Sequence, residues 1–188
     1  MLLGLTRGKN SFIIIKKTAF IGDGEIEMII RPATADDISA SDEIYKSAKK
    51  FMHENGNPDQ WNLDYPSGKD VAEGIANGTS YVCEDNGEVV ATFYFNQYED
   101  PTYAEIYEGK WLSDRPYAVI HRIAVKHRGR GIIGFIFNEC FKLYPNLRID
   151  THEQNAPMRA ALEKAGFKYC GIIHLPNGDP RIAFQKEE

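Results

Sequence analysis

The spacing of apolar positions along the chain alternates between two periods, which together predict its secondary structure. Short apolar or alternating runs indicate strands, whereas apolar residues three and four apart indicate helices. The expected strands are 29–33, 80–84, 89–96, 117–125, 147–151, 168–174 and 181–185, and the expected helices are 34–54, 67–77, 131–144 and 155–165. The order β-α-α-β-β-β-α-β-α-β-β is typical of a mixed α/β domain.

Turn and capping residues support these boundaries. Thr34 precedes Asp37 by three residues, as in a capping box at a helix N-terminus. Asn86-Gly87 lies between two apolar runs, which is a strong signal for a β-hairpin. Pro145 ends the helix 131–144, and Pro157 stands in the first turn of the helix 155–165.

Composition excludes several classes of protein. With 188 residues, of which 43% are hydrophobic and 26% charged, the chain can form one domain with a substantial core. Its formal net charge of −5 argues against a nucleic-acid partner held by a general basic surface. No apolar run approaches the length of a membrane span, so no membrane partner is expected.

The cysteines and histidines show no signature of a disulfide framework or a metal site. Cys83, Cys140 and Cys170 are far apart and form no CxxC pair, which suits a reducing cytoplasm. His152 begins a sequence like the zinc-protease motif HExxH, but Ala156 stands where the second histidine would be. No metal cofactor is expected.

Residues 1–27 differ in character from residues 28–188, which we assign to the domain itself. The apolar run 12–15 is too short for a secretory core. The sequence Gly-Asp-Gly-Glu at 22–25 implies purine-rich codons just before Met28. One hypothesis is therefore that Met28 is the natural start and 22–25 a translated ribosome-binding site. The alternative is an extra strand around 12–15 that covers a sheet edge.

The most informative segment is the apolar strand that ends at Val125 and runs into a glycine-arginine turn. Arg128-Gly129-Arg130-Gly131 follows this strand, and an apolar helix follows the turn. Such a junction aims backbone N–H groups and a helix N-terminus at one point, which suits a phosphate group. No GxxxxGK[ST] sequence occurs, so a nucleoside-triphosphatase P-loop is excluded.

Together with the element order, this segment resembles the Gcn5-related N-acetyltransferase (GNAT) superfamily. The turn 128–131 is similar to that family's pyrophosphate-binding turn. The strand 147–151 leading to Asn155, with Gly166-Phe167 eleven residues later, is similar to its second signature helix, in a branch common among small bacterial acetyltransferases. The resemblance implies a mixed, mostly antiparallel sheet with a splay between two parallel strands, flanked by helices, that binds acetyl-CoA.

The resemblance also implies the coenzyme-binding residues and shows two departures. Acetyl-CoA is expected to bind Ile123, Ala124, Val125, Arg128, Gly129, Arg130, Gly131, Ile132, Ile133, Gly134 and Asn155. At Ile133 the family has a small residue, so the turn amides point inward here only if Ile133 faces the core. At Leu162 it often has a tyrosine that protonates the departing thiolate, and leucine cannot do so. Tyr169 is a substitute donor or simply a packed aromatic.

Acetyl transfer to an amine requires a neutral nitrogen, and His121 is the candidate base. An alkylamine with a pKa near 10 is neutral in about one molecule per thousand at pH 7, a penalty of roughly 4 kcal/mol. On strand 117–125, His121 is expected to alternate with Ile123 and Val125 on one face, opposite Arg122. A histidine here also resembles the catalytic histidine of arylalkylamine acetyltransferases. The alternative is a buried histidine with a structural role.

The acceptor amine is expected to bind among aromatic residues that come from two loops and one strand. Trp61, Tyr65, Tyr94 and Trp111 could surround an amine by cation–π contacts, although for each residue alone plain packing is the favoured role.

These observations favour an acetyl-CoA-dependent N-acetyltransferase acting on a primary amine of a small molecule or peptide. The alternative is a catalytically weak acyl-CoA-binding sensor, which the departures at Ile133 and Leu162 motivate. Exposed strands of such folds often pair, so a homodimer is compatible with this reading, and nucleic-acid binding through 126–130 is the least supported function.

Overall fold

The fold is one mixed eight-stranded sheet with helices on both faces. The computed structural model describes residues 15–21 and 24–188. Its strands lie in the order β1-β2-β3-β4-β5-β6-β8-β7, and among them only β5 and β6 run parallel. The strands are β1 (Ile15–Ile21), β2 (Gly24–Pro32), β3 (Ser80–Asp85), β4 (Glu88–Asn96), β5 (Ala118–Val125), β6 (Asn146–Thr151), β7 (Lys168–His174) and β8 (Pro180–Glu187). The helices are α1 (Ile38–Glu54), α2 (Gly68–Ala76), α3 (Ile132–Leu143) and α4 (Ala156–Lys164), with short 3-10 turns η1 (Ala35–Asp37) and η2 (Pro101–Tyr103).

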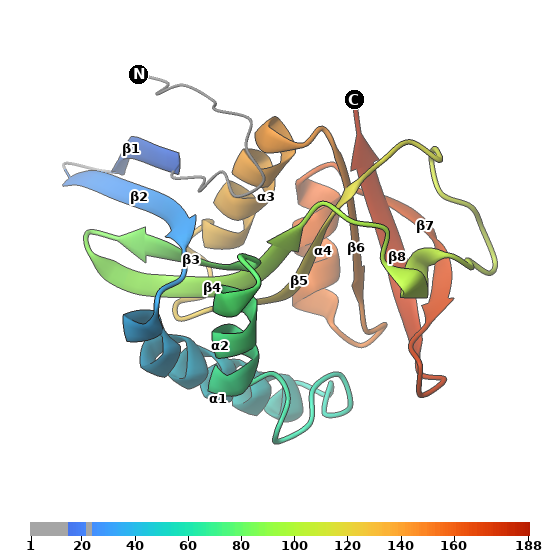
Figure 1. Ribbon diagram of the computed structural model, residues 1–188, viewed down its shortest axis with the longest axis horizontal. Helices are drawn as coiled ribbons and strands as arrows, with labels where there is room; N and C mark the ends of the chain where they lie inside the picture. Colours follow the sequence, from blue (N-terminus) through green and yellow to red (C-terminus); the bar gives the residue numbers. More distant parts are fainter. Residues whose placement is uncertain (1–14, 22–23) are drawn as a thin grey trace.

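The helices cover both faces of the sheet, so the apolar core has one part on each face. Figure 1 shows α3 on the side opposite α1 and α2. The largest apolar cluster joins the sheet to α3 and α4 and includes Ile120, Ile136 and Leu162. A second cluster joins α1 and α2 to the other face through Ile44, Tyr45 and others. Both faces of the central strands are therefore buried, which explains their near-continuous apolar runs.

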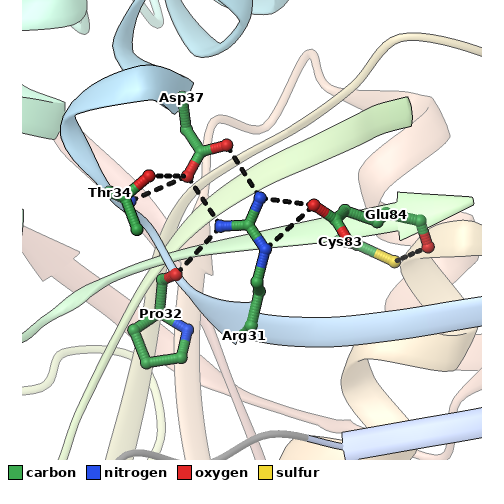
Figure 2. A network of polar contacts seen from close by, with 6 residues as sticks. All are labelled: Arg31, Pro32, Thr34, Asp37, Cys83 and Glu84. Carbon is green, nitrogen blue, oxygen red and sulfur yellow. Dashed lines mark hydrogen bonds and ion pairs between the residues drawn. The ribbon is translucent and has the colours of Figure 1, made fainter. Parts of the chain in front are cut away.

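A polar network fixes the start of α1 against the sheet (Figure 2). Arg31 on β2 donates to both carboxylate oxygens of Asp37, at 2.7 and 2.9 Å, and also to Glu84 on β3. Asp37 additionally accepts the Thr34 N–H at 2.7 Å, which completes the capping box that the sequence predicts. Burial opposes the charge of Asp37, but the hydrogen bonds from Arg31 and Thr34 outweigh burial and lower its pKa.

Each helix and strand expected between residues 29 and 188 is found; β2 begins earlier than expected, at Gly24, and α1 begins later, at Ile38, after the turn η1. Ser67 forms a second capping box with Asp70 at the start of α2. The Asn86-Gly87 turn has positive φ at both residues, as a tight hairpin requires. Residues 12–14 of the apolar run lie outside the described residues. A strand, β1, begins at Ile15 and pairs antiparallel with β2, so the edge of β2 is covered.

The parallel strands β5 and β6 separate soon after they meet. They pair at Ala118–Leu147 and Val119–Arg148 and at no later position. Beyond these pairs, β5 remains paired with β4, and β6 remains paired with β8, but β5 and β6 no longer pair with each other. The sheet therefore contains the expected splay, which opens at the C-terminal ends of β5 and β6.

A long connection between the neighbouring strands β4 and β5, residues 97–117, reaches across the splay to β7 and returns, and we name it the crossing segment. Tyr107 forms two main-chain hydrogen bonds of 2.8 Å with Ile172 on β7. Two glycines permit this approach: a Cβ at Gly109 would lie 2.0 Å from the Cys170 carbonyl oxygen, and one at Gly171 would lie 2.5 Å from that of Tyr107. The crossing segment thereby covers the far half of the face that carries α1 and α2.

Candidate active site

A bulge in β5 determines which side chains border the splay. Tyr94 pairs with His121 and Thr92 with Ala124, so β5 has one residue more than β4 over this stretch. Arg122 takes up the extra residue with a φ of 52°, a left-handed conformation that costs on the order of 1–3 kcal/mol for a non-glycine residue. Bulges next to active sites characteristically redirect a side chain.

The bulge overturns the alternation expected for His121. Ile123 and Val125 lie in the cluster with α3 and α4, on the same face as Ile120 and opposite His121. The expectation is wrong because it assumed a regular strand of period two, which one left-handed residue interrupts. As a result, His121 and Arg122 line the same cleft although they are consecutive.

His121 lies between two carboxylates, one on β6 across the splay and one on the crossing segment. Its Nε2 is 2.9 Å from Oδ2 of Asp100 on the crossing segment, and its Nδ1 is 3.5 Å from Oδ1 of Asp150 on β6. The rings of Tyr94 and Tyr103 also pack near it, each with its centroid 5.8 Å from that of the imidazole. The histidine is thus held in one orientation, with 23% of its side chain exposed to the cleft.

Each carboxylate is fixed by further donors. Asp100 accepts the N–H and hydroxyl of Thr102, at 2.9 and 2.7 Å, and the hydroxyl of Tyr98 at 2.7 Å. Burial opposes its charge, but these bonds and the one from His121 outweigh burial and hold the pKa of Asp100 well below its usual range. Asp150 accepts the hydroxyl of Tyr103, at 2.8 Å, and Tyr103 is fully buried.

The glycine-arginine turn leads from β5 into α3. Gly129 and Gly131 adopt φ values of 80° and 74°, and a Cβ at either position would meet no atom within 4 Å. Glycine is therefore required there by backbone conformation, not by lack of space. Ile132 is buried, and Ile133 packs against the core, which is the condition under which the turn amides can face a ligand. Arg128 stacks on the ring of Phe51 in α1, 3.8 Å from its centroid.

Asn155 caps α4 and connects it to the loop after α1. Its Oδ1 accepts the Met158 N–H at 3.1 Å, and its Nδ2 donates to Oε1 of Gln60 at 2.8 Å. The same Gln60 oxygen accepts the Nδ2 of Asn57. The side-chain amide of Asn155 thus holds the loop after α1 close to the end of β6.

The splay opens into a cleft of about 530 Å³. It is lined by predicted site residues from several elements: Trp61, Tyr65, Tyr94, His121, Ile123 and Asn155. Thr151, at the end of β6, also lines it, and its buried hydroxyl has no hydrogen-bond partner among the described residues. The residues of the turn 128–134, together with Ala124 and Val125, lie outside the lining of this cleft.

Three of the four predicted acceptor aromatics border the cleft, and Trp111 does not. Trp61 stands edge-on to Tyr45, 5.7 Å between centroids, and Tyr65 is 44% exposed at the mouth. Trp111 instead packs on Tyr103 and stacks under the guanidinium of Arg148, 4.0 Å from its centroid. Its indole N–H donates to the Tyr103 carbonyl, so it supports the crossing segment.

Neither position considered for a proton donor reaches the cleft. Leu162 is completely buried between α4 and the core, and Tyr169 lies on β7 with 52% of its surface exposed and its ring edge on Phe184. Both therefore contribute packing.

The cleft contains functional groups that sequence reasoning missed, above all Asp100, Asp150 and Arg122. Asp150 could have been noticed, because it is the one carboxylate of a strand that ends at the splay. Asp100 gave no such signal, since it reaches His121 only through the path of the crossing segment. Arg122 was assigned to the opposite face because a bulge has no clear sequence signature.

No group of three or more His, Cys, Asp or Glu side chains among residues 15–21 and 24–188 is arranged to hold a metal ion. Within the same residues, no helix is long and apolar enough to cross a bilayer.

A splayed sheet with a glycine turn at the end of its central strand defines an acyl-CoA-type acyltransferase fold, and the comparisons agree with this. Residues 41–167 match the family model "Acetyltransferase (GNAT) family". A GNAT-family acetyltransferase from Streptococcus agalactiae is 32% identical, with a TM-score of 0.79, over 86% of this chain and 95% of that one. The chain belongs to the GNAT acetyltransferase family.

More distant structures share the fold. RimJ of Mycobacterium smegmatis, in complex with CoA-disulfide, is 17% identical with a TM-score of 0.56, over 90% of this chain and 85% of that one. AAC(6')-Ib in complex with paromomycin and acetyl-CoA is 18% identical with a TM-score of 0.56, over 86% and 93%. No curated protein sequence matches the chain.

Proposed function

We propose that the protein is an acetyl-CoA-dependent N-acetyltransferase that acetylates a primary amine and uses His121 as its base. The observation that carries the proposal is the position of His121, clamped by Asp100 and Asp150 at the edge of the cleft where β5 and β6 separate. Acetyl-CoA would supply a thioester acyl group, and transfer to the amine yields an amide and a free thiol.

The residues around the splay suit the coenzyme. The space beside Gly129 and Gly131 is open, because a Cβ at either position would meet no atom within 4 Å. The first backbone N–H groups of α3 have no acceptor within the helix, so they are available to bind an anion. Thr151, whose buried hydroxyl has no hydrogen-bond partner among the described residues, and Asn155 both line the cleft at the end of β6. We therefore assign the pyrophosphate to 128–134 and the pantetheine arm to the gap between β5 and β6.

The hydrogen bonds of His121 suggest which nitrogen accepts the proton. Nε2 donates to Asp100 at 2.9 Å, which leaves the lone pair on Nδ1. Asp150 Oδ1 stands 3.5 Å from Nδ1, too far for a good hydrogen bond but close enough to stabilise the imidazolium when Nδ1 takes the amine proton. Asp100 thus orients the ring, and Asp150 compensates the charge that develops on it.

The buried Leu162 does not prevent this chemistry. An ordinary thiol titrates near 8.5, so a thiolate is a tolerable leaving group at neutral pH without a dedicated donor. A slower release step is the expected cost. The same observation supports the second candidate, a CoA-binding sensor with little turnover.

Release of free thiol from acetyl-CoA, measured with a panel of primary amines, tests the proposal. Amine-stimulated release, together with CoA binding by calorimetry, is the expected result. Tight CoA binding without stimulated release by any amine would favour the sensor, and no CoA binding at millimolar concentration would contradict both functions.

A further inference from the structure

Arg122 is a charged group beside the reacting centre that acetyl transfer itself does not use. Its left-handed backbone directs the side chain to the cleft that His121 also lines. The side chain is only 17% exposed. A guanidinium that has lost most of its hydration needs partners, from the protein or from a ligand.

The described residues satisfy this guanidinium only in part. Its Nη1 lies 3.6 Å from Oδ1 of Asp70, an ion pair too long for a good hydrogen bond. Its Cζ lies 4.9 Å from the centroid of the Tyr94 ring. Oδ2 of Asp70 is already engaged by the N–H and hydroxyl of Ser67 in the cap of α2. Because a guanidinium carries five N–H donors, much of its hydrogen-bonding capacity remains for a ligand.

Arg122 also stands where the cleft meets a second cavity. It lines both the main cleft and an adjoining pocket of about 340 Å³, which Thr79 and Asn96 also border. The Tyr94 ring neighbours both groups: its centroid is 5.8 Å from that of His121 and 4.9 Å from Cζ of Arg122. A small molecule that presents an amine to His121 can therefore extend past Tyr94 to Arg122.

We propose that the acceptor is an amino carboxylate, whose carboxylate binds Arg122 while its amine faces His121. This inference rests on the proposed acetyl transfer and names the class of its acceptor. The planar guanidinium matches a carboxylate with two parallel N–H···O bonds, which a single ammonium cannot reproduce. The left-handed conformation of Arg122 is then the means by which two consecutive side chains bind the two ends of one substrate.

A diamine fits this end of the cleft less well. A second ammonium would meet the charge of Arg122 at close range, and of the two nearby carboxylates Asp70 already faces the guanidinium and Glu73 is exposed. Diamines are therefore the competing acceptor class that the experiment includes.

The test compares the standard amino acids with their amino acid amides and with short diamines, by thiol release from acetyl-CoA. An amide keeps the amine and the side chain but lacks the carboxylate, and its amine deprotonates at lower pH, so chemical reactivity alone favours the amide. We expect the best amino acid to exceed its amide in kcat/KM by roughly tenfold to hundredfold. Equal or faster turnover of amides or diamines overturns the inference.

Substitutions separate recognition from a structural role of Arg122. Arg122→Gln should raise KM for the amino acid and leave the amide little changed, and Arg122→Lys should restore only part of the preference. Arg115→Gln is the matched control, because Arg115 is exposed, pairs with Glu187 and lies outside the cleft. If Arg122→Gln lowers kcat/KM equally for an amino acid and for its amide, the inference is wrong.

Calorimetry of the CoA-saturated protein with amino acids and their amides distinguishes a failure of the proposed acetyl transfer from a failure of the proposed carboxylate site. If no compound is acetylated but amino acids bind in preference to amides in an Arg122-dependent manner, acetyl transfer fails and the carboxylate site stands. If amines are acetylated without this preference, the function stands and the carboxylate site fails. Absence of amino acid binding at millimolar concentration also overturns it.

Discussion

At the scale of single residues, the site depends on how one imidazole is held. His121 contacts two carboxylates and two tyrosine rings, and none of these four neighbours is adjacent to it in sequence. The proposed proton transfer and a purely structural role can therefore be separated only by their different dependence on pH.

His121→Ala should reduce kcat/KM by roughly tenfold to hundredfold at pH 7. The loss should shrink as the pH approaches the pKa of the acceptor amine, near 10 for an alkylamine, because the amine then deprotonates without a base. The pH profile of thiol release, with melting curves to verify folding, measures this. A reduction of the same size at every pH would mean that the histidine is structural.

Asp100→Asn should destabilise the protein by about 2 kcal/mol at neutral pH, because an amide cannot accept the four hydrogen bonds that Asp100 receives. The pKa of Asp100 is lower in the folded chain than in the unfolded one, so its contribution is complete above about pH 4 and is lost on acidification. The difference between the two proteins in urea should therefore shrink from pH 7 to pH 3. A difference that is constant over this range would contradict the assignment of a charged Asp100.

At the scale of secondary structure elements, the sequence determines more of the fold than of the site. The capping boxes at Thr34 and Ser67, the Asn86-Gly87 hairpin and the strand-turn-helix junction each leave a local signature, and all are found. The bulge at Arg122 arises from the pairing of β5 with β4, so it depends on a neighbour 30 residues away. Local patterns could not predict it.

Gly131→Asp should weaken CoA binding strongly, because the new carboxylate repels the pyrophosphate at the start of α3. Gly131→Ala is the matched control: with a φ of 74° and open space around its Cβ, it costs only about 1 kcal/mol in backbone strain. Calorimetry with CoA measures both. If Asp and Ala have the same affinity as the unaltered protein, the turn does not bind the pyrophosphate.

At the scale of the whole molecule, the crossing segment joins the two halves of the sheet. β5 and β6 share two residue pairs, and the segment adds the contact between Tyr107 and Ile172 on β7. No local sequence pattern predicts this contact. For this reason the sequence did not predict the position of Asp100 beside His121 or the supporting role of Trp111.

Gly171→Ala should detach the crossing segment from β7, because its Cβ would lie 2.5 Å from the Tyr107 carbonyl oxygen. We expect a loss of stability of roughly 2–4 kcal/mol, and reduced thiol release although no residue of the cleft is changed. Gly178→Ala is the control, since its φ is also positive but its Cβ would meet nothing within 4 Å. Equal melting temperatures for the two variants would contradict this account of the segment.

The ring of His121 and the carboxylate of Asp150 lie on opposite sides of the splay. β5 carries the imidazole and β6 carries Asp150, whereas Asp100 lies between β4 and β5 and donates its N–H to Tyr117, just before β5. The distance between the imidazole and Asp150 consequently depends on how far β5 and β6 separate. Substitutions on β7 that change this separation should therefore change the rate of thiol release, although they lie outside the cleft.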